Sequence, residues 1–220
     1  MSNKAKDKTK ESQILNAAAK HFAINGFDGA RVDEIAAEAG VNKATLYYRI
    51  GDKAALYDRI FGDMLDNVLE NIAKDVMSAQ RVEDKFRAYT YAIAQVCNSN
   101  EYLSSFILRE IASGGVHMSS DALEKMHQIR LALFEIIQLG IDKEEFKPIN
   151  SFLVHMMLVG TLNFYSASLP IRNKISQKEH TAKTRPDPTL LEVAENISEL
   201  VLNSIRINSD ENAQRGQIRT

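Results

Sequence analysis

The sequence predicts an all-α protein of about nine helices, and three observations support that prediction. Apolar residues recur at the 3.6-residue period of a helix along nearly the whole chain, and no stretch alternates convincingly as a strand would. Only 10 of the 220 residues are Gly and 4 are Pro, so few positions interrupt a helix. Hydrophobic residues make up 45% and charged residues 25% of the chain, the balance of a globular protein with a sizeable core.

The first two helices are predicted from apolar stripes that end at glycines. The stripe over 14–23 stops at Gly26, and the shorter stripe over 32–39 stops at Gly40. Asp33 and Glu34 lie in the first turn of the second helix, where their negative charge opposes the positive end of the helix dipole.

The third and fourth helices are predicted from their caps. Asn42 is a good N-cap for a short third helix that carries Leu46 inward. Gly51 and Asp52 then break the chain and cap a long connecting helix over 53–78, whose apolar stripe covers about seven turns.

Five further helices are expected where apolar stripes restart after breaks. Their approximate ranges are 82–96, 102–111, 119–140, 150–168 and 189–207. Between the last two, residues 170–188 are interpreted as a polar connector, because this segment runs from Pro170 to Pro188 and carries several Lys and Arg residues. Residues 208–220 are expected to form a disordered tail.

Charge, cysteine content and hydropathy indicate the kind of partner and the cell compartment that the protein is suited to. Residues 1–53 hold nine basic and seven acidic residues, whereas the remainder is net acidic, so the N-terminal quarter is the part suited to a polyanion. A solvated charged tail explains the same asymmetry. The single Cys97 cannot form an internal disulfide, and no uncharged run is long enough to span a membrane, so a cytoplasmic protein is expected.

Residues 32–51 predict two short helices joined at Gly40, the arrangement of a helix-turn-helix. Ala36 is small enough for the second helix to approach the first, and Leu46 attaches that helix to the shared core. The second helix would expose Lys43, Ala44, Thr45, Tyr48 and Arg49. Donors at the start of such a helix can read base edges in a major groove. An ordinary helical hairpin is the alternative.

The same region carries a more specific pattern: Ile14-Leu15, Ala18, Phe22, Gly26-Phe27, Val32, Ile35-Ala36, Ala39-Gly40-Val41, Thr45-Leu46-Tyr47-Tyr48, Lys53 and Leu56. This pattern resembles the TetR family of bacterial transcriptional regulators over residues 11–60, about a quarter of the chain. The resemblance implies an N-terminal three-helix DNA-binding domain, followed by a C-terminal helical domain that dimerises and binds a small effector.

The resemblance also implies roles for individual residues. Lys43 and Ala44 match positions that read base edges, and Tyr48 lies near the groove. The positions that match phosphate contacts are Thr45, Tyr47, Arg49 and Lys53. Because base contacts set specificity, Lys43 is the best specificity candidate.

Two departures from the family pattern affect this contact set. Arg31 stands where the family usually has a Ser or Thr that caps the second helix and touches DNA. An arginine cannot cap in that way, but it can reach a phosphate. Arg49 and Ile50 replace the more usual His and Phe, which keeps a donor and an apolar side chain at these positions.

A homodimer is expected, because two-fold dimers read the two half-sites of an inverted repeat in operator DNA. The interface candidates are the helices near 150–168 and 189–207. The resemblance implies that these two helices form a four-helix bundle across the two-fold axis, while an intrachain core is the alternative for some of their faces.

Polar and aromatic residues within apolar helices are candidates for contacts with the effector. The candidates are Tyr89, Phe106, Arg109, His127, Arg130, His155 and Asn163. If Arg109 is buried, it needs an anionic partner, either Glu110 or a ligand. His117, His127 and His155 are too scattered for a metal site, and no cofactor is expected.

The predicted function is that of a ligand-responsive transcriptional regulator, a repressor that releases its operator when a small effector binds. The predicted domains are 1–53 for DNA binding and 54–207 for effector binding and dimerisation. A helical scaffold that has lost DNA binding is one alternative. An all-α enzyme is a weaker alternative, because the sequence lacks a Gly-rich phosphate loop, paired Cys, His-Glu-x-x-His and Gly-x-Ser-x-Gly.

Overall fold

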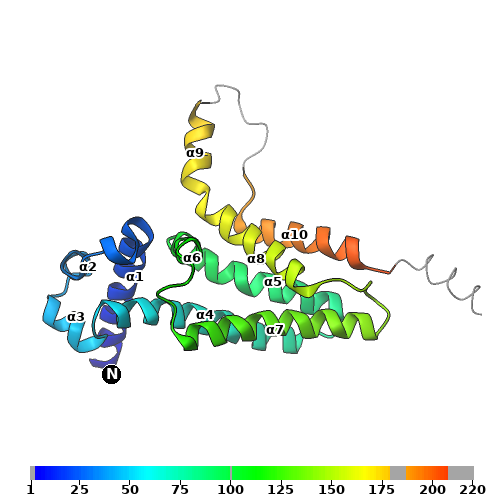
Figure 1. Cartoon of the computed structure of the whole chain (residues 1–220), viewed down its shortest axis with the longest axis horizontal. Coiled ribbons are helices and arrows are strands. Elements are labelled where there is room, and N and C mark those ends of the chain that lie inside the picture. The colour runs from blue at the N-terminus through cyan, green and yellow to red at the C-terminus, as the bar shows by residue number, and fades with distance from the viewer. Residues whose placement is uncertain (1–2, 100, 179–186, 208–220) are drawn as a thin grey trace, which may run out of the picture. The chain divides into compact units, whose positions relative to one another are not determined.

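The computed structural model describes residues 3–99, 101–178 and 187–207, and these residues form an all-α fold as predicted (Figure 1). The only β-type pairing in the described ranges is an isolated bridge between Phe146 and Arg206. The ten helices are α1 (Asn3–Gly29), α2 (Val32–Glu38), α3 (Lys43–Arg49), α4 (Lys53–Ser78), α5 (Val82–Ser99), α6 (Leu103–Ala112), α7 (Ser120–Asp142), α8 (Ser151–Ala167), α9 (Leu169–Lys178) and α10 (Leu190–Ile205).

Helix α9 corrects the prediction of a polar connector over 170–188. The segment is polar and begins at Pro170, but Pro170 is the second residue of the helix. A proline is tolerated in the first turn because its missing N–H would have no intrahelical acceptor there. Residues 179–186 and the predicted tail 208–220 lie outside the described residues.

The chain forms two compact units. The first comprises Met1–Asn67, Val96–Met126 and Asn163–Ala182. The second comprises Val68–Gln95, His127–Leu162 and Lys183–Thr220. Among the described helices none is long and apolar enough by itself to cross a membrane, although α8 and the start of α9, bent by 54°, together satisfy the length and composition for a broken span.

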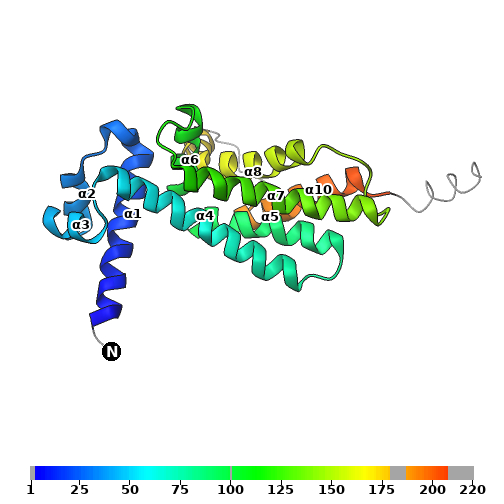
Figure 2. The same cartoon turned by 60° about the horizontal axis from the view of Figure 1, so that its bottom comes forward.

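In the first unit, α1 packs on α2 and α6, and α2 packs on α3. Both views show α2 and α3 beside α1 (Figures 1 and 2). Ile14, Ile35 and Leu46 are fully buried, so one apolar side chain from each of the first three helices lies in the core. The regular part of α1 ends at Gly26, whose φ of 71° and ψ of 178° are not helical, which agrees with the predicted stop.

In the second unit, α5 and α10 lie side by side and are joined by ion pairs. Arg87 contacts Glu199 at 2.6 Å, and Arg206 contacts Glu83 at 2.7 Å. The hydrogen bond from Arg206 outweighs the partial burial of Glu83 and holds the pKa of that carboxyl below its usual value. Fully buried apolar side chains complete this core: Phe86, Leu133, Val154, Leu158 and Leu202.

Candidate nucleic-acid interface

The joint between α2 and α3 has the geometry that the sequence predicts. Ala36 is 3% exposed and Leu46 is fully buried, so the two helices share one core. Gly40 has a φ of 65°, a left-handed conformation in which a residue with a Cβ is strained. The Val41 N–H donates to the Ala36 carbonyl at 3.0 Å and closes the end of α2. This turn fixes the direction in which α3 leaves α2.

The start of α3 is capped as predicted. The Asn42 side chain accepts a hydrogen bond from the Thr45 N–H at 2.7 Å. One of the otherwise unsatisfied N–H groups of the first turn is therefore held by the protein itself. Ala44 is exposed and Tyr48 is 91% exposed, so one side of this short helix faces away from the core.

Lys43 is an exposed side chain with an acidic neighbour. Its ammonium group lies 2.9 Å from a carboxylate oxygen of Asp33 on α2. The hydrogen bond to Asp33 and the charge of Asp33 raise the pKa of Lys43, so the amine is protonated throughout the physiological range. A base or phosphate that takes this donor has to compete with Asp33.

Lys53 is positioned at the first residue of α4. Its ammonium group donates to the Asp28 carbonyl at 3.1 Å and lies 4.8 Å from the centre of the Phe27 ring. Asp52 caps this helix, as predicted, by accepting the Ala55 N–H at 2.9 Å. The positive charge of Lys53 is therefore held beside the end of α1 rather than left on a freely rotating chain.

Arg31 occupies the N-cap position of α2 and makes no side-chain capping bond, which agrees with the expectation that an arginine cannot cap. Its side chain is exposed. The remaining predicted contact residues lie on α3, where Tyr47 is 43% exposed and Thr45 and Arg49 are partly exposed. Of the eight predicted DNA-contact residues, Arg31 directly precedes α2, Lys53 is the first residue of α4, and the other six lie on α3.

The structure places Arg109 at an exposed position of α6, so the buried case considered in the sequence analysis does not apply. The side chain is exposed and needs no anionic partner, because it donates to the carbonyls of Ala23 and Ile24 at 2.6 and 2.7 Å. These carbonyls lie at the end of the regular part of α1, where a cation is favoured by the helix dipole. Arg109 therefore attaches α6 to α1.

Sequence reasoning missed a buried polar cluster centred on Glu110, which is 2% exposed. The carboxylate accepts from the Tyr57 hydroxyl at 2.5 Å, from the His117 N–H at 2.8 Å and from His117 Nδ1 at 3.2 Å. Burial opposes ionisation of Glu110, but these hydrogen bonds outweigh burial and hold its pKa below the usual value. The His117 ring stacks on Phe27, with 4.2 Å between ring centres. The cluster therefore joins α4, α6 and the end of α1.

The seven predicted effector residues fall into the two units. Tyr89, His127, Arg130 and His155 belong to the second unit, and Phe106, Arg109 and Asn163 belong to the first. Phe106 is fully buried among aromatic rings, and the amide of Asn163 accepts from the Cys97 thiol at 3.7 Å. Asn163 and Phe106 are therefore both buried in the core of the first unit.

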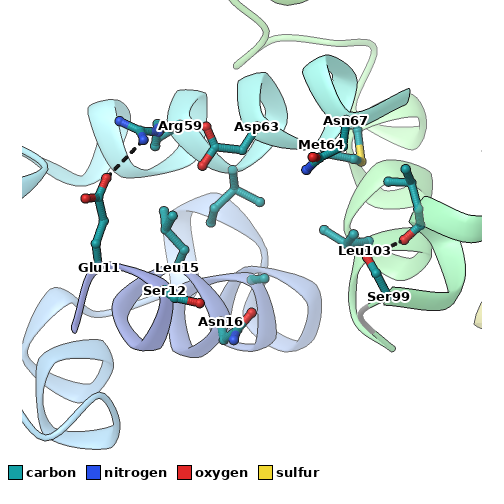
Figure 3. A pocket seen from close by; sticks show the side chains of 13 residues that line it. Glu11, Ser12, Leu15, Asn16, Arg59, Asp63, Met64, Asn67, Ser99 and Leu103 are labelled. Atoms are coloured by element: carbon teal, nitrogen blue, oxygen red, sulfur yellow. Dashed lines mark hydrogen bonds and ion pairs between the residues drawn. The ribbon is translucent and has the colours of Figure 1, made fainter. Parts of the chain in front are cut away.

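A groove of about 480 Å³ lies between α1 and α4 in the first unit (Figure 3). Arg59 crosses one side of it and pairs with Glu11 at 3.0 Å and with Asp63 at 2.7 Å. None of the seven predicted effector residues lines this groove. Within the part of the chain that the structure describes, no group of three or more His, Cys, Asp or Glu residues could hold a metal ion.

A capped, exposed helix that follows a tight turn on a three-helix core defines a helix-turn-helix DNA-binding protein. Residues 14–60 match the family model described as bacterial regulatory proteins, tetR family. The matched segment is a TetR-type DNA-binding domain, and the chain is a DNA-binding transcriptional regulator.

Similar proteins align with more of the chain, and the solved structures among them share its fold. The HTH-type transcriptional regulator YhgD of Bacillus subtilis is 24% identical over 147 residues, which is 66% of this chain and 76% of YhgD. The structure of the ketosteroid transcriptional regulator KstR2 of Mycobacterium tuberculosis aligns with a TM-score of 0.70 at 18% identity, covering 90% of this chain and 95% of KstR2. FadR of Bacillus subtilis, solved in complex with stearoyl-CoA, aligns with a TM-score of 0.63 at 20% identity, covering 87% of this chain and 97% of FadR.

Proposed function

We propose that this regulator is a homodimeric repressor that binds an inverted-repeat operator and releases it when a small effector binds. The observation that carries the proposal is the exposed face of α3, which follows a rigid turn and begins with the capped residues Lys43 and Ala44. A helix presented in this way can enter a major groove, and a two-fold dimer doubles the contacts. The operator-bound protein would act in the cytoplasm.

The DNA contacts divide into base reading and phosphate binding. Lys43, Ala44 and Tyr48 lie on the exposed side of α3 and would face base edges. The phosphate contacts would come from Arg31, Thr45, Tyr47, Arg49 and Lys53. In this proposal residues 1–53 form the DNA-binding domain, and residues 54–207 bind the effector and dimerise.

Dimerisation through α8 and α10 is supported by apolar side chains that the isolated chain leaves exposed. Phe152, Leu153 and Met156 on α8 are 53%, 56% and 51% exposed, and Leu200 on α10 is 68% exposed. The α8 residues follow i, i+1, i+4 spacing and form one stripe, which a second copy would cover.

FadR was solved with stearoyl-CoA, so fatty acyl compounds are the first effectors to test.

Selection of bound duplexes from a random pool tests the proposal. Purified protein should enrich an inverted repeat, and Lys43→Ala should relax the preference at one position per half-site, which corresponds to about 1–3 kcal/mol of discrimination. Lys53→Ala should instead weaken all sequences alike and reduce the salt dependence of binding. Failure to enrich any duplex at low salt would favour the scaffold alternative, and equal losses from both variants would refute base reading by Lys43.

A further inference from the structure

The groove between α1 and α4 in the first unit has an apolar floor. Its volume of about 480 Å³ lies within the range of about 300–1,000 Å³ that is usual for small-molecule sites. The end of α5 and the start of α6 lie at one end of the groove (Figure 3). The floor consists of side chains that are each at most 8% exposed: Ala19, Ile60, Met64, Val96 and Leu103. An apolar group that enters the groove would therefore contact side chains that the fold already holds in place.

The rim of the groove carries a net negative charge. Arg59 of α4 points toward α1, where its Nη2 lies 3.0 Å from Glu11 Oε1, and its Nε lies 2.7 Å from Asp63 Oδ1 (Figure 3). One guanidinium and two carboxylates leave a net charge of −1. In the described ranges Arg59 is the only cation paired with these two carboxylates, and each of them has a second oxygen that can accept from another donor. The rim is therefore suited to one more positive charge.

The charges of the rim discriminate among ligand classes. An anion would face Glu11 and Asp63, and it would have to take Arg59 away from one of them. A neutral ligand would leave the negative charge uncompensated. A cation compensates this charge while Arg59 keeps both of its partners, and hydrogen bonds between ionised groups are the stronger ones. Ser12 of α1 and Asn67 of α4 line the same groove and add neutral acceptor oxygens.

We propose that this groove binds a small monovalent organic cation with an apolar body, such as an arylalkyl ammonium compound. The ammonium group would donate to Asp63 and Glu11, which already share one cation, and the apolar body would lie on the floor beside Ile60 and Met64. Because α1 supplies one wall, the site extends beyond residues 54–207, to which the proposed function assigns the effector. The proposal is therefore independent of the repressor function.

Calorimetric titration of the full chain at low ionic strength tests the choice of ligand class. The probe is 4-phenylbutylamine, and its matched controls are 4-phenylbutanol and 4-phenylbutyrate, which carry the same apolar body with no charge or with a negative charge. The amine should bind at least about fivefold more tightly than either control, because only the amine offers a charged donor. Its binding should weaken as salt is added, because the rim is partly exposed to solvent.

Substitutions of the carboxylates test the role of the rim. Asp63→Asn should weaken binding of the amine at least about threefold. Asp58→Asn removes the same charge from an exposed position of α4 that does not line the groove, and it should leave binding unchanged. The double variant Glu11→Gln, Asp63→Asn leaves Arg59 without its two partners, so it should bind 4-phenylbutyrate more tightly than the amine.

Two neighbouring positions of α1 test the location of the site. Ser12 and Gln13 are both exposed, but only Ser12 lines this groove. Ser12→Tyr should fill the groove and abolish binding of the amine, whereas Gln13→Tyr should leave binding unchanged.

Several results would overturn the proposal. These are equal binding of the amine and the alcohol, tighter binding of 4-phenylbutyrate by the native chain, equal losses in Asp58→Asn and Asp63→Asn, and undiminished binding in Ser12→Tyr. Each of these measurements is made without DNA, so such a result leaves the repressor function standing. Conversely, binding of the amine by a chain that enriches no duplex would refute the repressor function and leave the cation site in place.

Discussion

Replacement of Glu110 by Gln should destabilise the protein more than any conservative surface change. The carboxylate accepts three hydrogen bonds, two of them from His117 and one from Tyr57. Glutamine has one acceptor oxygen, and its NH2 group would face a donor. Hydrogen bonds to a charged group contribute about 1.5–3 kcal/mol, and an unsatisfied buried donor costs about 1–3 kcal/mol. We therefore expect a loss of about 2–4 kcal/mol in the free energy of unfolding.

Thermal unfolding followed by circular dichroism measures this loss, and for a chain of this length a few kcal/mol lower the apparent Tm by on the order of 10 °C. Glu195→Gln, on an exposed position of α10, is the matched control and should change stability by less than about 0.5 kcal/mol. Tyr57→Phe should cost clearly more in the native background than in the Glu110→Gln background, because the shared hydrogen bond is lost only once. Equal costs in both backgrounds would refute the reasoning.

The pH dependence of the same variant has a definite sign. The pKa of Glu110 is lower in the folded protein than in the unfolded chain, where it lies near 4.5. The ionised group therefore contributes its stability above pH 4.5, and this contribution is lost as the pH falls through the lower folded-state value. The difference in stability between the native chain and Glu110→Gln should stay constant from pH 8 to about 5 and shrink below about 4.5. A difference that grows on acidification would contradict the assignment.

Three further changes have expected outcomes. Arg31→Ser places a capping hydroxyl at a residue that already has extended backbone (φ −112°, ψ 125°), so stability should rise by about 1 kcal/mol in urea unfolding while DNA affinity and its salt dependence fall. Asn42→Ala removes the cap of α3 and should cost about 1 kcal/mol in the same assay and weaken binding to every duplex, with Asn42→Asp retaining stability. Gly140→Ala would place a Cβ 2.1 Å from the Phe146 ring, so overpacking should lower stability by about 1–3 kcal/mol, and Phe146→Leu should partly rescue it.

The helix-turn-helix could be predicted from sequence because its determinants are local. Gly40 sets the turn, Asn42 caps α3, and Leu46 is buried, and each of these features depends on neighbours within a few residues. The wrong prediction at α9 also has a local explanation: the segment is polar and begins at Pro170, but a proline in the first turn of a helix removes no hydrogen bond. Local rules of this kind identify the DNA-binding helix but do not choose among its exposed side chains.

The contacts around α6 could not be predicted, because they are set by helix geometry over long separations in sequence. Arg109 and Glu110 are adjacent and oppositely charged, which suggests a pair, but adjacent helical residues point in different directions. Arg109 instead reaches carbonyls of α1 that lie 85 and 86 positions earlier, and Glu110 reaches Tyr57, 53 positions earlier. Tyr57 packs edge-on against Phe27, and the ammonium group of Lys53 lies over the Phe27 ring. A change at α6 therefore acts on the residues that hold Lys53, and Glu110→Gln should weaken DNA binding as well as stability.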